Sequence, residues 1–179
     1  MALLLETERL ILRPLAPEDF ESHAAMMADA RVARFLSPGG KVPSRESAWR
    51  GFAMMLGHWT IRGYGFFSAI EKESGRWVGR VGPWMPEGWP GLECGWGVDP
   101  SYWGKGYAPE AAVATIRWLF AERPDLDRII SLIDPANDNG QAVAAKIGET
   151  RTGEIHHHEI AGALDIWACP RDEWLKRFG

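Results

Sequence analysis

The chain opens with an alternation of apolar and polar residues and then changes to a helical spacing. The alternation over residues 9–15 predicts a first strand, which two prolines end. The acidic pair Glu18 and Asp19 suits the start of a helix, where the helix dipole is positive. We expect this helix to run towards Arg34.

A second helix is predicted from a Ser44 cap to about Arg62. Its apolar residues recur at the spacing of one helix face, and we expect that face to form core. The residues are Trp49, Phe52, Ala53, Leu56 and Trp59.

From Gly65 the pattern changes to short β-like runs, at residues 66–70, 77–81 and 92–98. The turn sequence Glu73-Ser74-Gly75 separates the first two, so an antiparallel meander is expected. Pro109 then suits the first turn of another helix, with a core-facing stripe at Ala112, Val113, Ile116, Leu119 and Phe120.

The last third of the chain alternates between strand and helix patterns. A strand is expected at residues 128–133, a helix at 139–147, and strands at 150–158 and 164–169. This order implies a right-handed parallel crossover. The predicted fold is a mixed α/β sheet with helices on both faces, and with no repeat or linker in sight we expect a single domain over residues 1–179.

Composition narrows the class of partner. The 179 residues are 46% hydrophobic and 25% charged, which is typical of a globular protein and argues against disorder. A net charge of −4 argues against nonspecific binding to nucleic acid, and no run is long and apolar enough for a membrane span. The apolar start lacks the length of a signal peptide, and the two cysteines suit a reducing cytoplasm, so we expect a cytoplasmic protein.

The sequence WGKGYAPEA at residues 103–111 is the most informative segment. It joins the strand that ends at Val98 to the helix near Pro109, so main-chain N–H groups at a helix start would point outward. Gly104 and Gly106 would let the main chain approach an anion closely, and Lys105 would add positive charge. A diphosphate is the best match, although a tight connection without a ligand has the same pattern.

This segment resembles the diphosphate loop of the GNAT superfamily of N-acetyltransferases, Gln/Arg-x-x-Gly-x-Gly/Ala, with Trp103 in the first place and Ala108 in the last. Residues 7–20, 93–111, 137–149 and 165–174 are similar to segments of the subgroup that contains the ribosomal-protein N-terminal acetyltransferases. The motif in residues 137–149 has Gly140 where that subgroup usually has Ser.

The resemblance implies a mostly antiparallel sheet with one splayed parallel pair, and acetyl-CoA as the cosubstrate without a metal. Pantetheine would pair like an added strand with the main chain of the strand at residues 93–98. The implied acetyl-CoA residues are Trp96, Gly97, Val98, Trp103, Gly104, Lys105, Gly106, Tyr107, Ala108 and Asn137. For Asn137, helix capping is an open alternative.

Transfer of acetyl to an amine requires a neutral nucleophile. An alkyl ammonium is neutral at pH 7 only about one time in 2,500, a penalty of about 4.6 kcal/mol. The resemblance makes Glu93 the candidate base; its alternative role is that of a solvated or Arg-paired carboxylate. A main-chain N–H near Val98 would hold the developing oxyanion, and no residue is identified as the general acid.

Three further features have two interpretations each. Cys94 next to Glu93 could carry an acyl group, but strand alternation favours a buried, inert thiol. The run His156-His157-His158-Glu159 could suggest a metal, but an exposed hairpin or the rim of the acceptor site fits better. Trp84 and Trp89 could stack on the acceptor or pack against the second helix.

The acceptor stays open between a protein N-terminus and a small-molecule amine, and so does a homodimer. The alternative function is an inactive CoA-binding sensor or interaction module.

Overall fold

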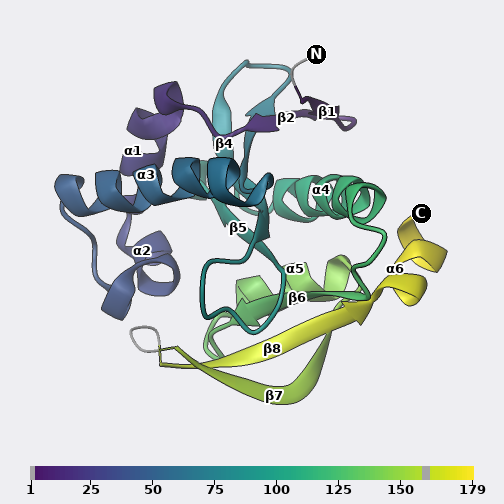
Figure 1. The fold of residues 1–179 in the computed structure, drawn as a ribbon. Helices are drawn as coiled ribbons and strands as arrows, with labels where there is room; N and C mark the ends of the chain where they lie inside the picture. Colours follow the sequence, from purple (N-terminus) through teal and green to yellow (C-terminus); the bar gives the residue numbers. More distant parts are fainter. Residues whose placement is uncertain (1–2, 159–161) are drawn as a thin grey trace.

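The computed structural model describes residues 3–158 and 162–179, and its strands form one sheet (Figure 1). The order across this sheet is β1-β2-β3-β4-β5-β6-β8-β7. The strands are β1 (Leu5–Glu6), β2 (Leu10–Pro14), β3 (Phe67–Glu71), β4 (Trp77–Trp84), β5 (Glu93–Val98), β6 (Arg128–Ile133), β7 (Thr150–His158) and β8 (Gly162–Pro170). The expected strands are all present, and β1 is an addition that the sequence pattern did not predict.

The parallel pair at the centre of the sheet is β5 and β6, and every other pairing is antiparallel. All six residues of β5 pair with β4, whereas β5 pairs with β6 only at Glu93 and Ile130. The two parallel strands therefore separate beyond Glu93, which confirms the predicted splay. The main chain of β5 from Gly95 onward lacks a strand on that side.

The helices are α1 (Phe20–Met27), α2 (Ala30–Leu36), α3 (Arg45–Arg62), α4 (Tyr107–Glu122), α5 (Asp138–Lys146) and α6 (Arg171–Phe178). Figure 1 shows α1, α2 and α3 grouped together at the left and α4 at the right of β5. Within the described residues no helix is long and apolar enough to cross a membrane.

The single helix expected from Glu18 towards Arg34 is wrong, because the chain breaks it into α1 and α2. Asp29 has an extended backbone, with ψ of 121°, and its side chain accepts a hydrogen bond from the Arg31 N–H. This cap begins a new helix in a new direction. The break therefore changes the direction in which Arg31 and Arg34 of α2 extend, compared with a single continuous helix.

Helix α3 begins after Ser44 as predicted, since the Ser44 side chain accepts from the Ser47 N–H. Its buried residues are Ala48, Phe52, Met55 and His58. The prediction of Trp49 as core is wrong, because its side chain is 57% exposed. Apolar residues of α3 are spread widely enough to form either of two faces. The buried face includes Ala48 and leaves its neighbour Trp49 outside.

The main core lies between the sheet and α4. Ala112, Ile116, Leu119 and Phe120 of the predicted stripe are buried there, while Val113 is partly buried. Cys94 joins this core, and burial raises the pKa of its thiol well above the ordinary value, as an inert cysteine requires. One polar exception is the carboxyl group of Glu149, which is 2% exposed.

Candidate functional site

A cavity of about 580 Å³, here called the turn cavity, lies against the glycine-rich turn. Nine of the ten residues predicted to bind acetyl-CoA line it: Trp96, Gly97, Val98, Trp103, Gly104, Gly106, Tyr107, Ala108 and Asn137. Lys105 does not line it. The predicted residues thus gather around one space although they come from three parts of the chain.

The turn itself is built on glycine. Gly104 and Gly106 have φ of 77° and 80°, in the left-handed region that disfavours a Cβ. Gly106 is also the N-cap of α4, whose first turn carries N–H groups without intrahelical partners. The turn therefore presents main-chain donors and the positive end of a 16-residue helix to the cavity.

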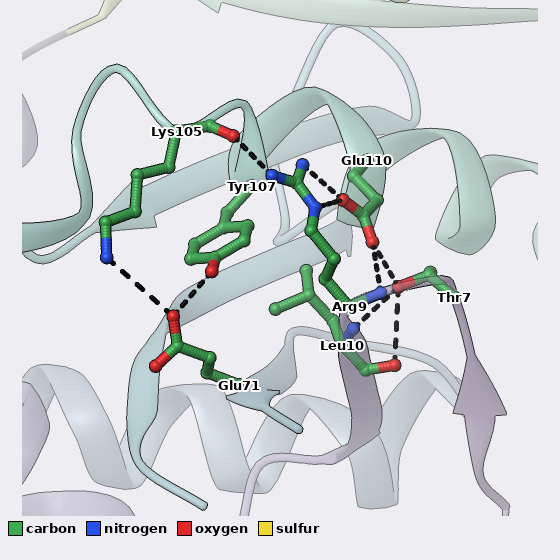
Figure 2. Close-up of polar contacts among 7 residues, drawn as sticks. All are labelled: Thr7, Arg9, Leu10, Glu71, Lys105, Tyr107 and Glu110. Carbon is green, nitrogen blue, oxygen red and sulfur yellow. Dashed lines mark hydrogen bonds and ion pairs between the residues drawn. The ribbon is translucent and has the colours of Figure 1, made fainter. Parts of the chain in front are cut away.

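A polar network fastens this turn to the start of the chain (Figure 2). The Glu110 carboxylate on α4 accepts from the Thr7 hydroxyl at 2.6 Å, the Arg9 N–H at 2.9 Å and the Arg9 Nε at 2.7 Å. Arg9 in turn donates through Nη1 to the Lys105 carbonyl at 2.8 Å. The position of the turn is thus fixed by residues almost a hundred positions earlier.

The side chain of Lys105 is not part of the lining of the turn cavity. Its Nζ lies 3.8 Å from Glu71 Oε1 on β3, and the same oxygen accepts from the Tyr107 hydroxyl at 2.5 Å (Figure 2). The hydrogen bond to Glu71 raises the pKa of Tyr107. Lys105 and Tyr107 therefore brace the turn through Glu71, and the charge expected from Lys105 is used outside the cavity.

Other basic side chains supply charge to the turn cavity, and the sequence reasoning missed them. Arg31 and Arg34 of α2 and Lys146 of α5 line it. The Arg31 guanidinium is held by Asp29 at 2.6 Å and lies 5.3 Å from the Trp103 ring centroid. The signal that could have found Arg31 is the Asp29 cap, which starts α2.

Trp103 replaces the Gln or Arg of the resembling loop and makes a contact of its own. Its indole N–H donates to the Val98 carbonyl at 2.7 Å, which joins the turn to the end of β5. That carbonyl is therefore already engaged on the splayed side of the strand. The main chain left for an added strand lies before it, around Trp96 and Gly97.

Gly95 and Gly97 are glycine mainly because protein side chains pack on them. A Cβ at Gly95 would lie 3.0 Å from the Phe66 ring, and one at Gly97 would lie 2.7 Å from Leu36 Cδ1. This close packing explains both glycines without any ligand.

Asn137 performs the capping role that the sequence left open. Its Oδ1 accepts from the Gly140 N–H at 3.0 Å at the start of α5. A Cβ at Gly140 would lie 2.7 Å from Asn137 Nδ2, so the capping amide leaves no room for the Ser of the resembling motif. Asn137 nevertheless lines the turn cavity as well.

Glu93 lies in a second cavity of about 540 Å³, here called the Glu93 cavity. The Trp89 indole N–H donates to Glu93 Oε2 at 2.6 Å, and the Leu132 N–H approaches Oε1 at 3.5 Å. Burial raises the pKa of Glu93 to about 7, while Trp89, Leu132 and the charge of Arg80 act in the opposite direction. Glu93 is therefore neither a solvated surface carboxylate nor part of an ion pair within the described residues.

Aromatic side chains surround Glu93. Trp84 is 6% exposed and packs with Phe52 and Met55, so it both contacts α3 and lines the cavity. Trp89 lies at the rim, with its ring centroid 5.3 Å from that of His158.

The histidine run therefore belongs to the edge of the Glu93 cavity, through His158, while Glu159 lies outside the described residues. In the part of the chain that the structure describes, no group of three or more His, Cys, Asp or Glu side chains is placed to hold a metal.

The two cavities meet. Five residues line both of them, from the end of α2, the middle of β5 and the start of α5: Phe35, Leu36, Trp96, Asn137 and Gly140. A ligand that lies along the free edge of β5 could thus reach from the glycine-rich turn to the carboxyl of Glu93.

Comparison with known proteins agrees with this geometry. The acetyltransferase (GNAT) domain family matches residues 9–150. The uncharacterized N-acetyltransferase YnaD of Bacillus subtilis (strain 168) is 29% identical over 149 residues, which cover 83% of this chain and 84% of YnaD.

Solved structures have the same fold. An acetyltransferase from Agrobacterium tumefaciens str. C58 is 31% identical, with a TM-score of 0.78 and coverage of 94% of this chain and 95% of that one. RimL, a ribosomal-protein α-N-acetyltransferase solved in complex with coenzyme A, shares the fold at 16% identity, with a TM-score of 0.75 and coverage of 96% and 99%. The chain belongs to the GNAT family of acetyltransferases.

Proposed function

We propose that this enzyme transfers the acetyl group of acetyl-CoA directly to a primary amine, with both substrates bound at once. The observation that carries the proposal is the junction of the two cavities along β5, with anion-binding groups at one end and Glu93 at the other. The acetyl donor would occupy the turn cavity and the amine the Glu93 cavity. The family uses acetyl-CoA, whose thioester supplies the activated acetyl group.

The turn cavity fits the chemistry of coenzyme A. Its main-chain donors at Gly104 to Ala108 and the start of α4 suit a diphosphate. Arg31, Arg34 and Lys146 add three cationic side chains around the same space. The free main chain of β5 near Trp96 and Gly97 suits the amide groups of pantetheine, which would pair as an added strand.

Glu93 would accept the proton of the amine. Its pKa of about 7 lies between that of an ordinary carboxylate and that of an amine, which is the range in which a base is both deprotonated and effective near neutral pH. Cys94 would not carry the acetyl group, because its thiol is 1% exposed and held protonated by burial. Because Glu93 can act as the base and Cys94 is buried as a neutral thiol, the acetyl group would pass directly from acetyl-CoA to the amine without an acyl-enzyme intermediate.

The variant Glu93→Gln tests this proposal. We expect turnover to fall by roughly 100- to 10,000-fold, the usual contribution of a general base, with acetyl-CoA binding retained because Glu93 does not line the turn cavity. Thiol release across a panel of amines measures turnover, and calorimetry measures binding. Unchanged turnover near neutral pH would remove Glu93 from the mechanism, and coenzyme binding by the wild type without release for any amine would favour a sensor.

A further inference from the structure

A buried arginine in the Glu93 cavity has no hydrogen-bond or ion-pair partner among the described residues, and the charge of Glu93 acts on it only from beyond ion-pair distance. The Arg80 side chain of β4 is 8% exposed and lines the cavity. Its Nε is buried without a hydrogen-bond acceptor, and within residues 3–158 and 162–179 its guanidinium makes neither a hydrogen bond nor an ion pair. A buried charge is costly to leave unpaired. This position therefore suits an anionic group from outside the chain.

A stack of rings fixes the guanidinium in place. Its Cζ lies 4.1 Å from the Phe66 ring centroid. Phe66 is stacked on Trp84 with centroids 5.0 Å apart, and Trp84 is stacked on His58 at 4.4 Å. A guanidinium that stacks by its face keeps the donors along its edge free. Arg80 is thus held rigidly with donors available to the cavity.

Arg80 and Glu93 lie on the same side of the sheet. Arg80 pairs with Gly97 across β4 and β5, and a Cβ at Gly97 would lie 3.8 Å from Arg80 Cζ. A Cβ at Gly95 would lie 3.6 Å from Glu93 Oε1. Same-face neighbours on a strand are roughly 7 Å apart. The guanidinium and the carboxyl therefore lie over neighbouring positions of one face of the sheet, close enough to act on each other by charge and without forming an ion pair.

The charges in this deep part of the cavity are complementary to a zwitterion. Burial lowers the pKa of Arg80 to about 10, so the guanidinium is still a cation at neutral pH. His23 lines the same space and is neutral there, because burial and the charge of Arg80 lower its pKa to about 3. A monoanion would balance Arg80, whereas a dianionic phosphate would add excess negative charge beside Glu93.

We propose that Arg80 binds a carboxylate of the acceptor, so that the substrate is a small amine with a carboxylate close to its amino group, such as a free amino acid. The inference rests on the proposed function and narrows its acceptor. A carboxylate accepts two parallel hydrogen bonds from a guanidinium edge. A peptide N-terminus presents an uncharged amide at that place and would leave the guanidinium charge unbalanced.

The test uses free amino acids and the matched amino-acid amides, with acetyl-CoA and thiol release as the readout. For the wild type we expect kcat/KM to be roughly 10- to 100-fold higher for the best acid than for its amide, the contribution of a charge-assisted pair. The amide has the less basic amine, so proton removal alone would favour the opposite order.

The variant Arg80→Met retains packing on Phe66 and removes the charge. We expect it to lose the preference by losing activity on the acid, with activity on the amide retained, and Arg80→Lys to restore part of the preference. Arg62→Met is the matched control, since Arg62 pairs with the exposed Glu87 at 3.3 Å away from both cavities. Melting temperatures identify any variant that fails to fold, in which case the wild-type ratio and Arg80→Lys decide.

Three outcomes would overturn the inference. Equal kcat/KM for acids and amides in the wild type would exclude a carboxylate site and leave the proposed function intact. An equal loss on both substrates in Arg80→Met would assign Arg80 to the thioester or to the fold instead. Binding of acetyl-CoA without thiol release for any of the amines tested would remove the proposed function and this inference with it.

Discussion

The pKa of the Glu93 carboxyl group is set by opposing effects. Burial raises its pKa to about 7, whereas the Trp89 N–H at 2.6 Å stabilises the ionised form. Activity that needs the ionised form should therefore rise with pH through about 7 and then level off. Trp89 lies four residues before Glu93 in the loop between β4 and β5, so a loop residue sets the pH at which the strand residue works.

The variant Trp89→Phe should move this rise to higher pH. Loss of the donor removes stabilisation of the ionised carboxylate, and a hydrogen bond to a charged group corresponds to a shift of about 1 to 2 pH units. The pH dependence of kcat/KM measures the shift. Trp167→Phe is the control, because the buried Trp167 indole N–H has no hydrogen-bond partner among residues 3–158 and 162–179. A pH profile that stays in place in Trp89→Phe would contradict this role.

At the scale of elements, the glycine-rich turn depends on the N-terminal strands. Glu110 accepts hydrogen bonds from Thr7 and Arg9, and Arg9 donates another to the Lys105 carbonyl. The donors of the turn are main-chain groups, so their orientation is set by the path of the backbone. A substitution that breaks the Arg9 contacts should therefore weaken acetyl-CoA binding more than it lowers the rate of the reaction at Glu93.

We expect Glu110→Ala to weaken acetyl-CoA binding by roughly tenfold, because a loosened turn must be ordered on binding. Calorimetry measures this loss, and kcat at saturating acetyl-CoA should change much less. Glu122→Ala at the exposed end of the same helix serves as control. Tight binding in Glu110→Ala would show that the turn holds its shape without the network.

Local signals predicted most elements and much of the site. Strand alternation, the Ser44 cap and the glycine-rich turn are properties of neighbouring residues, and the structure has elements where they indicate them. The break at Asp29 was missed because acidic side chains occur inside helices as well as at caps. Trp49 was misplaced because only tertiary packing decides between two apolar faces of α3.

Arg80 was missed for a related reason. Its β4 segment reads as an ordinary strand, and only the pairing with Gly97 and the stack on Phe66 bring it beside Glu93. Asn137 and Gly140 show the converse, since a local cap accounts both for Asn137, which the resemblance assigns to acetyl-CoA, and for Gly140, which stands where the subgroup usually has Ser.

For the whole molecule, Glu149 limits stability. Burial raises its pKa well above the ordinary value of 4.5, so the folded protein holds a proton that the unfolded chain releases above that pH. The contribution of Glu149 protonation to the free energy of unfolding is therefore fully present below the unfolded pKa, and it is lost as the pH rises above that value. Ser131 acts in the opposite direction on the pKa of Glu149 and offsets only part of this cost.

The variant Glu149→Met should be more stable than the wild type at pH 8. Removal of a buried carboxyl whose burial cost is only partly offset contributes about 1–3 kcal/mol, or roughly 2 to 10 °C in Tm for a chain of this length. The gain should shrink towards pH 5, and scanning calorimetry at both pH values measures it. Glu173→Met on the exposed side of α6 is the control. A lower Tm in Glu149→Met at pH 8 would contradict this account.

The meeting of two cavities along β5 has a consequence for how such enzymes diversify. Residues of the glycine-rich turn line only the turn cavity, whereas residues of α3, the β4–β5 loop and the β7–β8 hairpin line only the Glu93 cavity. If the two substrates bind as proposed, substitutions in the second group change which amine is accepted without disturbing how the acetyl donor is held. On that proposal, a lineage would acquire new acceptors by substitution around the Glu93 cavity while the turn cavity stays constant.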